Sequence, residues 1–262
     1  MDLTAAQAAV RAQWPDVTTD QIVVLTTGWD CVAFDIQDRI IAKFPRHPKA
    51  LVALEREVAL LAAVRPAVTL PVPDLQLHAG PPRFSSHIKL PGTHLLTAQY
   101  DALPTAARDR LAADLARFLA ETHRLNPAQM RQLGAIALSP WPSGTQIAAR
   151  AMPLLPADLQ PMARAVLDRW DTLPPDPLGM VFGQFDGHGW NMAFDHAAGR
   201  LNGIYDFGDA GIGPCHQDFV YSSLISTDLT RRILPCYAGL TGQTPDKSRV
   251  DTLIGTHRLW EL

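Results

Sequence analysis

The pattern of apolar and polar residues predicts strands near the amino terminus and a long helix after them. Residues 31–36 alternate between the two classes and residues 39–45 are rich in β-branched side chains, which favours two strands. From residue 48 to residue 64 apolar side chains (Leu51, Leu54, Val58, Leu61) recur every three or four positions. That spacing predicts an amphipathic helix directly after the second strand.

Helical spacing dominates most of the remaining chain. Residues 104–123 carry a second apolar stripe, which begins after a proline suited to the first turn of a helix. Six prolines within 141–175 predict broken helices in that segment, because proline lacks the backbone N–H that a helix interior requires. We expect three more helices around 217–226, 228–240 and 246–258.

Two apolar runs of strand length lie within the helical half, at 178–182 and 201–205. Asp186 follows the first run closely, and Asp206 follows the second directly. We expect the two runs to form a hairpin-like pair, which would place both carboxylates at one end of a sheet. The alternative is that these residues only form turns, which Asp and Gly favour.

The residues around these carboxylates have a chemistry of their own. Segment 183–191 has the sequence GQFDGHGWN, and residues 206–208 are DFG. Phosphoryl transfer needs a carboxylate to orient the attacking hydroxyl and oxygen-bearing groups to hold Mg²⁺ against the nucleotide phosphates. Asp186, Asn191 and Asp206 can supply these groups, so the pattern is typical of a kinase catalytic loop with its metal-binding strand end.

A candidate phosphate-binding lysine lies in the strand-rich part. The chain has only four lysines, and Lys43 is the one in an apolar strand setting. Gly28, before the first strand, permits a tight turn whose backbone N–H groups can approach a phosphate. In kinases a strand lysine contacts the α/β-phosphates and is held by a glutamate of the next helix. Glu55 and Glu57 both qualify, because periodicity places them on opposite flanks of the apolar stripe.

Composition limits the kinds of partner that the protein can bind and the cellular compartment in which we expect it. A formal net charge of −3 with scattered arginines offers no basic surface for nucleic acid. No signal peptide is visible and no apolar stretch approaches the 18 residues of a membrane span, so we expect no membrane association. Three cysteines without a Cys-x-x-Cys pair suggest reduced thiols in the cytoplasm and no structural zinc.

Over nearly its full length the chain resembles the aminoglycoside phosphotransferase family of small-molecule kinases, closest to the 2''-phosphotransferase-like branch. The segments that carry the resemblance are 28–30 (GWD), 43–46 (KFPR), 57–61 (EVALL), 71–73 (PVP), 89–92 (KLPG), 186–191 and 206–211 (DFGDAG). The resemblance implies an α+β, two-lobed protein-kinase-like fold. It divides the chain into a small β-rich nucleotide-binding lobe, 1–91, and a larger, mostly helical catalytic and acceptor-binding lobe, 92–262, joined at the hinge Pro91-Gly92.

The same resemblance assigns roles to the candidate residues. Asp186 faces the acceptor hydroxyl of a small molecule, and Asn191 and Asp206 bind Mg²⁺. Lys43 contacts the phosphates of ATP or GTP, with Glu57 rather than Glu55 as its partner.

Two further positions have supporting roles in the resemblance. Asp218 matches a buried carboxylate that braces the catalytic loop through backbone hydrogen bonds, and a helix amino-terminal cap is its alternative role. Gln184 stands where the family usually has histidine, and its amide can brace the loop but cannot titrate. A second departure is Gly-Pro-Cys at 213–215, where the family more often has Gly-Asp-Pro.

We therefore predict a Mg²⁺-dependent small-molecule O-kinase, with two alternatives. A kinase-like nucleotide-binding protein with impaired catalysis is suggested by the departures at Gln184 and 213–215. A metal-dependent phosphohydrolase is suggested by a cluster of carboxylates and imidazoles in the sequence: Asp186, His188, Asp195, His196 and Asp206. As for the acceptor, few acidic residues follow Asp218, which weakens the case for a polycationic aminoglycoside.

Overall fold

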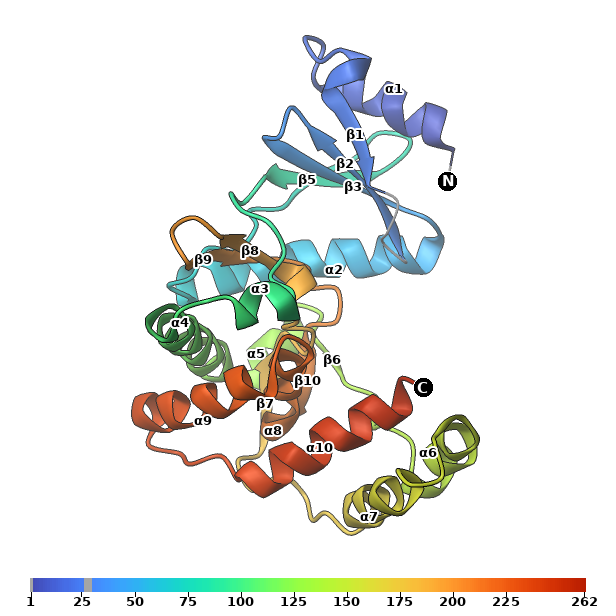
Figure 1. The fold of residues 1–262 in the computed structure, drawn as a ribbon. Coiled ribbons are helices and arrows are strands. Elements are labelled where there is room, and N and C mark those ends of the chain that lie inside the picture. Colours follow the sequence, from blue (N-terminus) through green and yellow to red (C-terminus); the bar gives the residue numbers. More distant parts are fainter. Residues whose placement is uncertain (1, 26–29) are drawn as a thin grey trace.

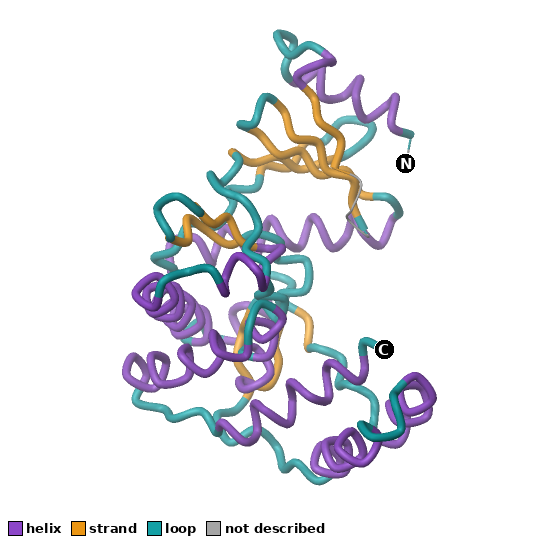
Figure 2. The backbone as a smooth tube through the Cα atoms, in the orientation of Figure 1, coloured by secondary structure: helices purple, strands orange, loops and turns teal. Residues whose placement is uncertain are grey.

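The computed structural model describes residues 2–25 and 30–262. A sheet with one helix on each side forms the amino-terminal end of the molecule, and helices dominate the rest (Figure 1). Figure 2 shows the strands gathered in that sheet and, in shorter pieces, around the middle of the molecule. No helix in the described ranges is long and apolar enough to cross a membrane.

The amino-terminal sheet has five antiparallel strands in the order β1-β2-β3-β5-β4. The predicted strand 31–36 is confirmed, and the predicted strand 39–45 begins one residue later, at Ile40. The strands and the preceding helices are α1 (Leu3–Gln13), η1 (Thr19–Gln21), β1 (Ile22–Leu25), β2 (Cys31–Ile36), β3 (Ile40–Pro45), β4 (Gln76–His78) and β5 (Phe84–Ile88).

The two faces of this sheet have different partners, because side chains alternate along each strand. Ala42 and Phe44 of β3 join a core with α1, to which the neighbouring strands add Phe34 and Phe84. Lys43, between them in the chain, lies on the opposite face, where it contacts helix α2 (Pro48–Val64). The strand pattern therefore directs Lys43 out of the apolar core.

Helix α2 has the predicted bounds. Pro48 occupies its first turn, and His47 caps it by accepting a hydrogen bond from the Ala50 N–H at 3.1 Å. Leu54 and Leu61 of the predicted stripe are buried, and so is Glu57. A short turn of 3₁₀ helix, η2 (Arg65–Ala67), follows α2.

The helix predicted from the second apolar stripe is confirmed as α4, which ends at His123. The broken helices predicted for segment 141–175 are confirmed as α6 and α7. The predicted helix around 217–226 is wrong as a single element: it is divided into α8 and the 3₁₀ helix η5. The elements are α3 (Thr97–Asp101), α4 (Thr105–His123), α5 (Pro127–Gln132), α6 (Gly144–Ala151), η3 (Met152–Leu154), α7 (Gln160–Asp171), α8 (Cys215–Asp218), η5 (Val220–Leu224), α9 (Thr227–Thr241) and α10 (Lys247–Trp260).

The predicted hairpin-like pair of 178–182 and 201–205 is wrong. The first run becomes β7 (Met180–Gly183) and pairs antiparallel with β10 (Gly211–Pro214), which also pairs with the two-residue β6 (Ile136–Ala137). The second run becomes β9 (Arg200–Ile204), whose partner is β8 (Met192–Asp195). The reason is that β8 starts directly after segment 183–191 and forms a hairpin with β9, which leaves β7 to pair with the later β10.

The segment after β5 is fastened to the β8–β9 hairpin. Gly92 has φ +129° and an added Cβ would lie 2.7 Å from the backbone of Phe194, so only glycine suits this approach. Thr93 and Phe194 then exchange two backbone hydrogen bonds, of 3.0 and 2.8 Å. The predicted hinge at Pro91-Gly92 thus lies where the chain leaves the first sheet and joins the second part of the molecule.

Candidate active site

Three charged side chains from distant elements meet beside the first sheet. The Nζ atom of Lys43 lies 3.6 Å from Glu57 Oε1 and 3.3 Å from Asp206 Oδ1. Burial by itself lowers the pKa of Lys43, but the two carboxylates outweigh it and raise that pKa. The Lys43 charge, in turn, lowers the pKa of Asp206. Lys43 is therefore a fixed cation and Asp206 a fixed anion at neutral pH.

The structure places Glu57, not Glu55, beside Lys43. Glu57 is 4% exposed, and its Oε1 also accepts a hydrogen bond from the Phe207 N–H at 2.9 Å. Glu55 lies on the outer flank of α2, where it pairs with Arg83 at 2.6 Å. Glu57 thus connects the lysine of β3 to the backbone just after Asp206.

Asp186 lies in the loop that follows β7, before the 3₁₀ turn η4 (Gly189–Asn191). Asn191 Nδ2 donates to Asp186 Oδ2 at 2.6 Å and to the Asp186 carbonyl oxygen at 3.0 Å. His188 Nε2 lies 3.2 Å from Asp186 Oδ1. The Asn191 side chain thus orients the Asp186 carboxylate through Oδ2, and the His188 ring lies beside its other oxygen.

The surroundings of Asp186 disfavour its negative charge. Burial raises the pKa of Asp186 to about 8, and the nearby charges of Asp209 and Asp206 contribute in the same direction. A carboxylate with a pKa in this range can exchange a proton near neutral pH.

Gln184 braces the loop in the manner expected from its amide. Its side chain is 1% exposed, and Nε2 donates to the carbonyl oxygens of Tyr205 and Asp206 at 2.9 and 3.1 Å. Asp206 has φ +63°, a left-handed conformation that a non-glycine residue adopts at some cost. The Gln184 amide therefore joins the end of β7 to the strained backbone after β9.

Asp218 braces the same loop from the other side. Its Oδ1 accepts a hydrogen bond from the Phe185 N–H at 2.7 Å, and its Oδ2 lies 3.1 Å from His123 Nε2. Phe185 also has a positive φ, +54°, so Asp218 fixes a second strained residue next to Asp186. The alternative role as a helix amino-terminal cap is wrong, because Asp218 is the last residue of α8.

Residues 213–215, where the sequence departs from the usual family pattern, pack against the loop that carries Phe185 and Asp186. Gly213 pairs with Val181 in the β10–β7 ladder, and an added Cβ would meet the Phe185 ring at 2.7 Å. Cys215 is buried against His123 and Tyr237. Among the described residues, this segment therefore supports the position of Phe185 and contributes no side chain to the Lys43–Asp206 contact.

Sequence reasoning missed two contributors to this site. Asp209 acts on the Asp186 carboxylate, and burial followed by the charge of Asp206 raises its own pKa. Arg56 Nη2 donates to the Gly208 carbonyl oxygen at 2.8 Å. The only signals were the second acid of the DFGD sequence and an arginine between the two candidate glutamates.

The predictions for Gly28 and for the carboxylate and imidazole cluster are not supported by contacts in the structure. Gly28 lies outside the described residues, so its predicted phosphate contact stays a prediction. In the described part of the chain, no three His, Cys, Asp or Glu side chains are grouped to hold a metal ion. His196 instead bonds to the His94 carbonyl oxygen at 3.0 Å, and Asp195 caps the turn at 197–198. His196 and Asp195, two members of the cluster behind the phosphohydrolase alternative, are thus engaged in hydrogen bonds outside the contacts of Asp186 and Asp206.

The donor atoms near Asp186 suit Mg²⁺. Asn191 and Asp206 offer amide and carboxylate oxygens, the hard ligands that this ion prefers. Burial raises the pKa values of Asp186 and Asp209, and the charge of Asp206 adds to both shifts. Mg²⁺ is usually bound through one or two protein ligands together with substrate phosphates and water, so Asn191 and Asp206 fit the ion without a closed cluster of acidic side chains.

Comparisons with known proteins agree with this geometry. The sequence model of the phosphotransferase enzyme family matches residues 21–251, which include every candidate site residue named above. A search of curated proteins gave no significant match.

Solved structures share the fold. A GDP complex of a point mutant of aminoglycoside 2'-phosphotransferase IIIa has a TM-score of 0.82 at 19% identity, covering 98% of this chain and 89% of that one. An APH(2'') enzyme with GDP and kanamycin has a TM-score of 0.74 at 22% identity, covering 97% and 87%. Macrolide 2'-phosphotransferase MphH from Brachybacterium faecium, without ligand, has a TM-score of 0.72 at 19% identity, covering 98% and 89%. The predicted α+β, kinase-like fold is confirmed.

Proposed function

The chain belongs to the phosphotransferase enzyme family, and on this basis we propose that it transfers the γ-phosphate of ATP or GTP to a hydroxyl group of a small molecule. The observation that carries the proposal is the meeting of Lys43, Glu57 and Asp206 beside a loop in which Asn191 orients Asp186. These are the parts that phosphoryl transfer needs: a cation for the phosphates, oxygen ligands for a metal and a carboxylate for the acceptor.

Each residue has a proposed role that follows from its contacts. Lys43, held by Glu57, would bind the phosphates, together with the backbone around Gly28. Asn191 and Asp206 would hold Mg²⁺, which when bound would neutralise charge on the transferred phosphoryl group. Asp186 would orient the acceptor hydroxyl and take up its proton. Most of the rate enhancement would come from positioning and charge neutralisation.

The two lobes would have separate tasks in this scheme. We propose that residues 1–91 bind the nucleotide and residues 92–262 hold the catalytic loop and the acceptor. The GDP complexes among the structural neighbours support a nucleotide co-substrate, and the neighbour with kanamycin supports a small-molecule acceptor.

The alternative of a catalytically impaired protein loses part of its basis. It rested on Gln184 and on the sequence at 213–215. Gln184 makes two hydrogen bonds that fix the backbone at Asp206, and the 213–215 segment supports Phe185. Neither departure removes a group that the proposed chemistry requires.

Substitution of two aspartates tests the proposal. We expect Asp186→Ala to lower phosphoryl transfer about 100-fold to 10,000-fold while nucleotide affinity is nearly unchanged, because Asp186 acts on the acceptor side. Asp206→Ala should weaken Mg²⁺-dependent nucleotide binding as well as turnover. Turnover is measured with a panel of hydroxyl compounds, and nucleotide binding by calorimetry with ATP and GTP. Full transfer by Asp186→Ala would show that the role given to Asp186 is wrong.

A further inference from the structure

The carboxylate of Asp186 has one oxygen that no side chain of the described residues binds. Asn191 Nδ2 donates to Oδ2 at 2.6 Å, whereas Oδ1 accepts no hydrogen bond from any group in the described ranges. In the proposed function, Oδ1 is therefore the oxygen that can accept the hydrogen bond of the acceptor hydroxyl.

The side chain of His188 lies next to that oxygen. Its Nε2 atom is 3.2 Å from Asp186 Oδ1, and the two side chains are exposed to a similar extent, 24% and 25%. The contact lacks the direction of a hydrogen bond, so the nitrogen is close to the carboxylate without being bonded to it. A ligand group that reaches Oδ1 therefore meets Nε2 as well.

Both ring nitrogens of His188 lack a hydrogen-bond partner in the part of the chain that the structure describes. Nδ1 is buried, and Nε2 has only its contact with Asp186. The neighbouring amides are engaged, because Gln184 donates to two carbonyl oxygens and Asn191 donates to Asp186. Since no hydrogen bond at Nδ1 fixes the tautomer, Nε2 can act as a donor or as an acceptor.

The backbone sets the positions of His188, Asp186 and Asn191 together. The His188 N–H donates to the Asp186 carbonyl oxygen at 2.7 Å, and the Asn191 N–H donates to the His188 carbonyl oxygen at 3.0 Å. The proposed catalytic carboxylate, the imidazole and a proposed Mg²⁺ ligand thus belong to one hydrogen-bonded turn.

The spacing of Oδ1 and Nε2 favours one kind of acceptor. Two hydroxyl oxygens on adjacent ring carbons, in the gauche arrangement, lie about as far apart as the two heavy atoms of a hydrogen bond. The separation of Oδ1 and Nε2 is of the same size. One hydroxyl can therefore donate to Oδ1 while its neighbour bonds to Nε2. A hydroxyl suits Nε2 in either tautomer, because it both donates and accepts.

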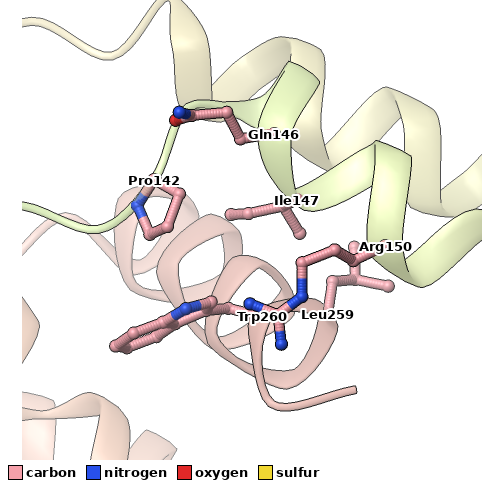
Figure 3. A pocket seen from close by; sticks show the side chains of 6 residues that line it. All are labelled: Pro142, Gln146, Ile147, Arg150, Leu259 and Trp260. Carbon is pink, nitrogen blue, oxygen red and sulfur yellow. The ribbon is translucent and has the colours of Figure 1, made fainter.

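A cavity in the helical part of the molecule does not provide these contacts. Its volume is about 230 Å³, and it lies between α6 and the end of α10 (Figure 3). Its lining contains no residue of the loop 183–191 or of segment 206–209 and consists of Pro142, Gln146, Ile147, Arg150, Leu259 and Trp260. The hydroxyl next to Asp186 thus has its neighbours in the loop and not in this cavity.

We propose that His188 is a specificity-determining residue whose Nε2 binds a second hydroxyl of the acceptor, on the carbon next to the one that is phosphorylated. The acceptor is accordingly a vicinal diol, of the kind that sugars and cyclitols contain. His188 receives this role on the basis of the proposed function, because it acts on the acceptor side of Asp186. In the transfer step the hydroxyl oxygen at Oδ1 bonds to the γ-phosphorus, the bond to the leaving nucleoside diphosphate breaks, and Asp186 takes up the hydroxyl proton.

Two isomeric diols test the spacing. The hydroxyls of cis-1,2-cyclohexanediol are on adjacent carbons, whereas those of trans-1,4-cyclohexanediol are too far apart to reach both atoms. Transfer of labelled γ-phosphate from ATP or GTP, with Mg²⁺ and the full chain, is measured for each diol. We expect kcat/KM for the 1,2-diol to be about three- to tenfold larger, which is the range for one neutral hydrogen bond.

Matched substitutions locate the preference. His188→Leu removes both ring nitrogens and should bring the two kcat/KM values close to each other, mainly through a larger KM for the 1,2-diol. His188→Gln places an amide near the position of Nε2 and should restore part of the preference. His196→Leu is the control, because this exposed histidine bonds to the His94 carbonyl oxygen, and it should keep the wild-type ratio.

The outcomes separate this role from the proposed function. Equal transfer to both diols, or transfer to neither by a protein that Mg²⁺ and nucleotide stabilise, would overturn the role of His188. A preference that His188→Leu retains, with both rates lowered alike, would do the same and would show a purely structural role. Failure of Mg²⁺ and nucleotide to raise the melting temperature of the wild-type protein would instead contradict the proposed function, since a ligand that binds the native state stabilises it.

Discussion

Gln184 and Asp206 are joined by a hydrogen bond in which the buried amide donates to the Asp206 carbonyl oxygen at 3.1 Å. The bond fixes the backbone of a residue whose φ is +63° and whose carboxylate lies 3.3 Å from Lys43. A side chain with no charge and no part in proton transfer thereby sets the position of the proposed metal ligand.

Loss of this amide should therefore damage catalysis through geometry. We expect Gln184→Leu to lower kcat and to weaken Mg²⁺-dependent nucleotide binding, with a loss of stability of about 1–3 kcal/mol for the two buried carbonyl oxygens that lose their donor. Gln184→His can restore one donor and should recover part of both losses. Equal behaviour of the two variants, in turnover assays and thermal melts, would contradict the bracing role.

The two glutamates of α2 form a natural matched pair. Glu57→Gln should lower nucleotide affinity and turnover, because it removes the buried charge that holds Lys43 while it leaves an oxygen for the Phe207 N–H. Glu55→Gln breaks only an exposed pair with Arg83, and pairs of that kind contribute about 0–1 kcal/mol. Nucleotide titrations on both variants check this prediction, and a comparable loss in Glu55→Gln would contradict it.

The raised pKa of Asp186 predicts a pH dependence. The ionised form should be the active one, so kcat/KM in limiting Mg²⁺ should rise with pH up to about 8. Asp209→Asn removes a charge that raises this pKa and should move the rising limb to lower pH. Asp195→Asn, at a turn away from Asp186, serves as the control and should leave the limb in place.

The same pKa has a consequence for stability, with a definite sign. The pKa of Asp186 is about 8 in the folded state and has its ordinary value of 3.8 in the unfolded chain, so the folded state holds the proton more tightly. Ionisation of Asp186 therefore destabilises the fold increasingly as pH rises from about 4 to about 8. Asp186→Asn stays neutral throughout. Its melting temperature should therefore exceed that of the wild type by an amount that grows with pH over this range, and a constant difference would contradict the assignment.

Asp218 should be important for stability as well as for activity. Asp218→Ala leaves the Phe185 N–H and His123 without their buried partner, and a buried polar group left unsatisfied costs about 1–3 kcal/mol. Asp218→Asn keeps one acceptor oxygen and should have a smaller effect. Denaturant midpoints measure both, with Asp168→Ala, exposed on α7, as a neutral control.

The local sequence pattern was enough to predict elements such as helix α2, whose capping residues and apolar stripe all lie within or next to the helix itself. Helix α2 has a proline in its first turn and an apolar stripe along its length, and its predicted bounds agree with the structure. The choice between Glu55 and Glu57 could not be made in this way, because it depends on where β3 places Lys43. The resemblance to known kinases supplied that information, and the ion pair at 3.6 Å agrees with it.

The pairing of the strands and the electrostatic effect of one aspartate on another could not be predicted from the local sequence. The partner of β7 is β10, a Gly-Ile-Gly-Pro sequence without the β-branched pattern by which strands are recognised. The effect of Asp209 on Asp186 arises only after the two loops have met in the folded protein. Neither relationship has a signature within a few residues of sequence.

The hydrogen bond between Glu57 and Phe207 also has a consequence for biosynthesis. The two residues are 150 positions apart in the chain. At a translation rate of about 5–20 residues per second, roughly 8 to 30 s would pass between the synthesis of the glutamate and that of its partner. The first sheet and α2 would wait on the ribosome with an incomplete ion-pair site, and nucleotide binding would begin only once the later segment had emerged and docked.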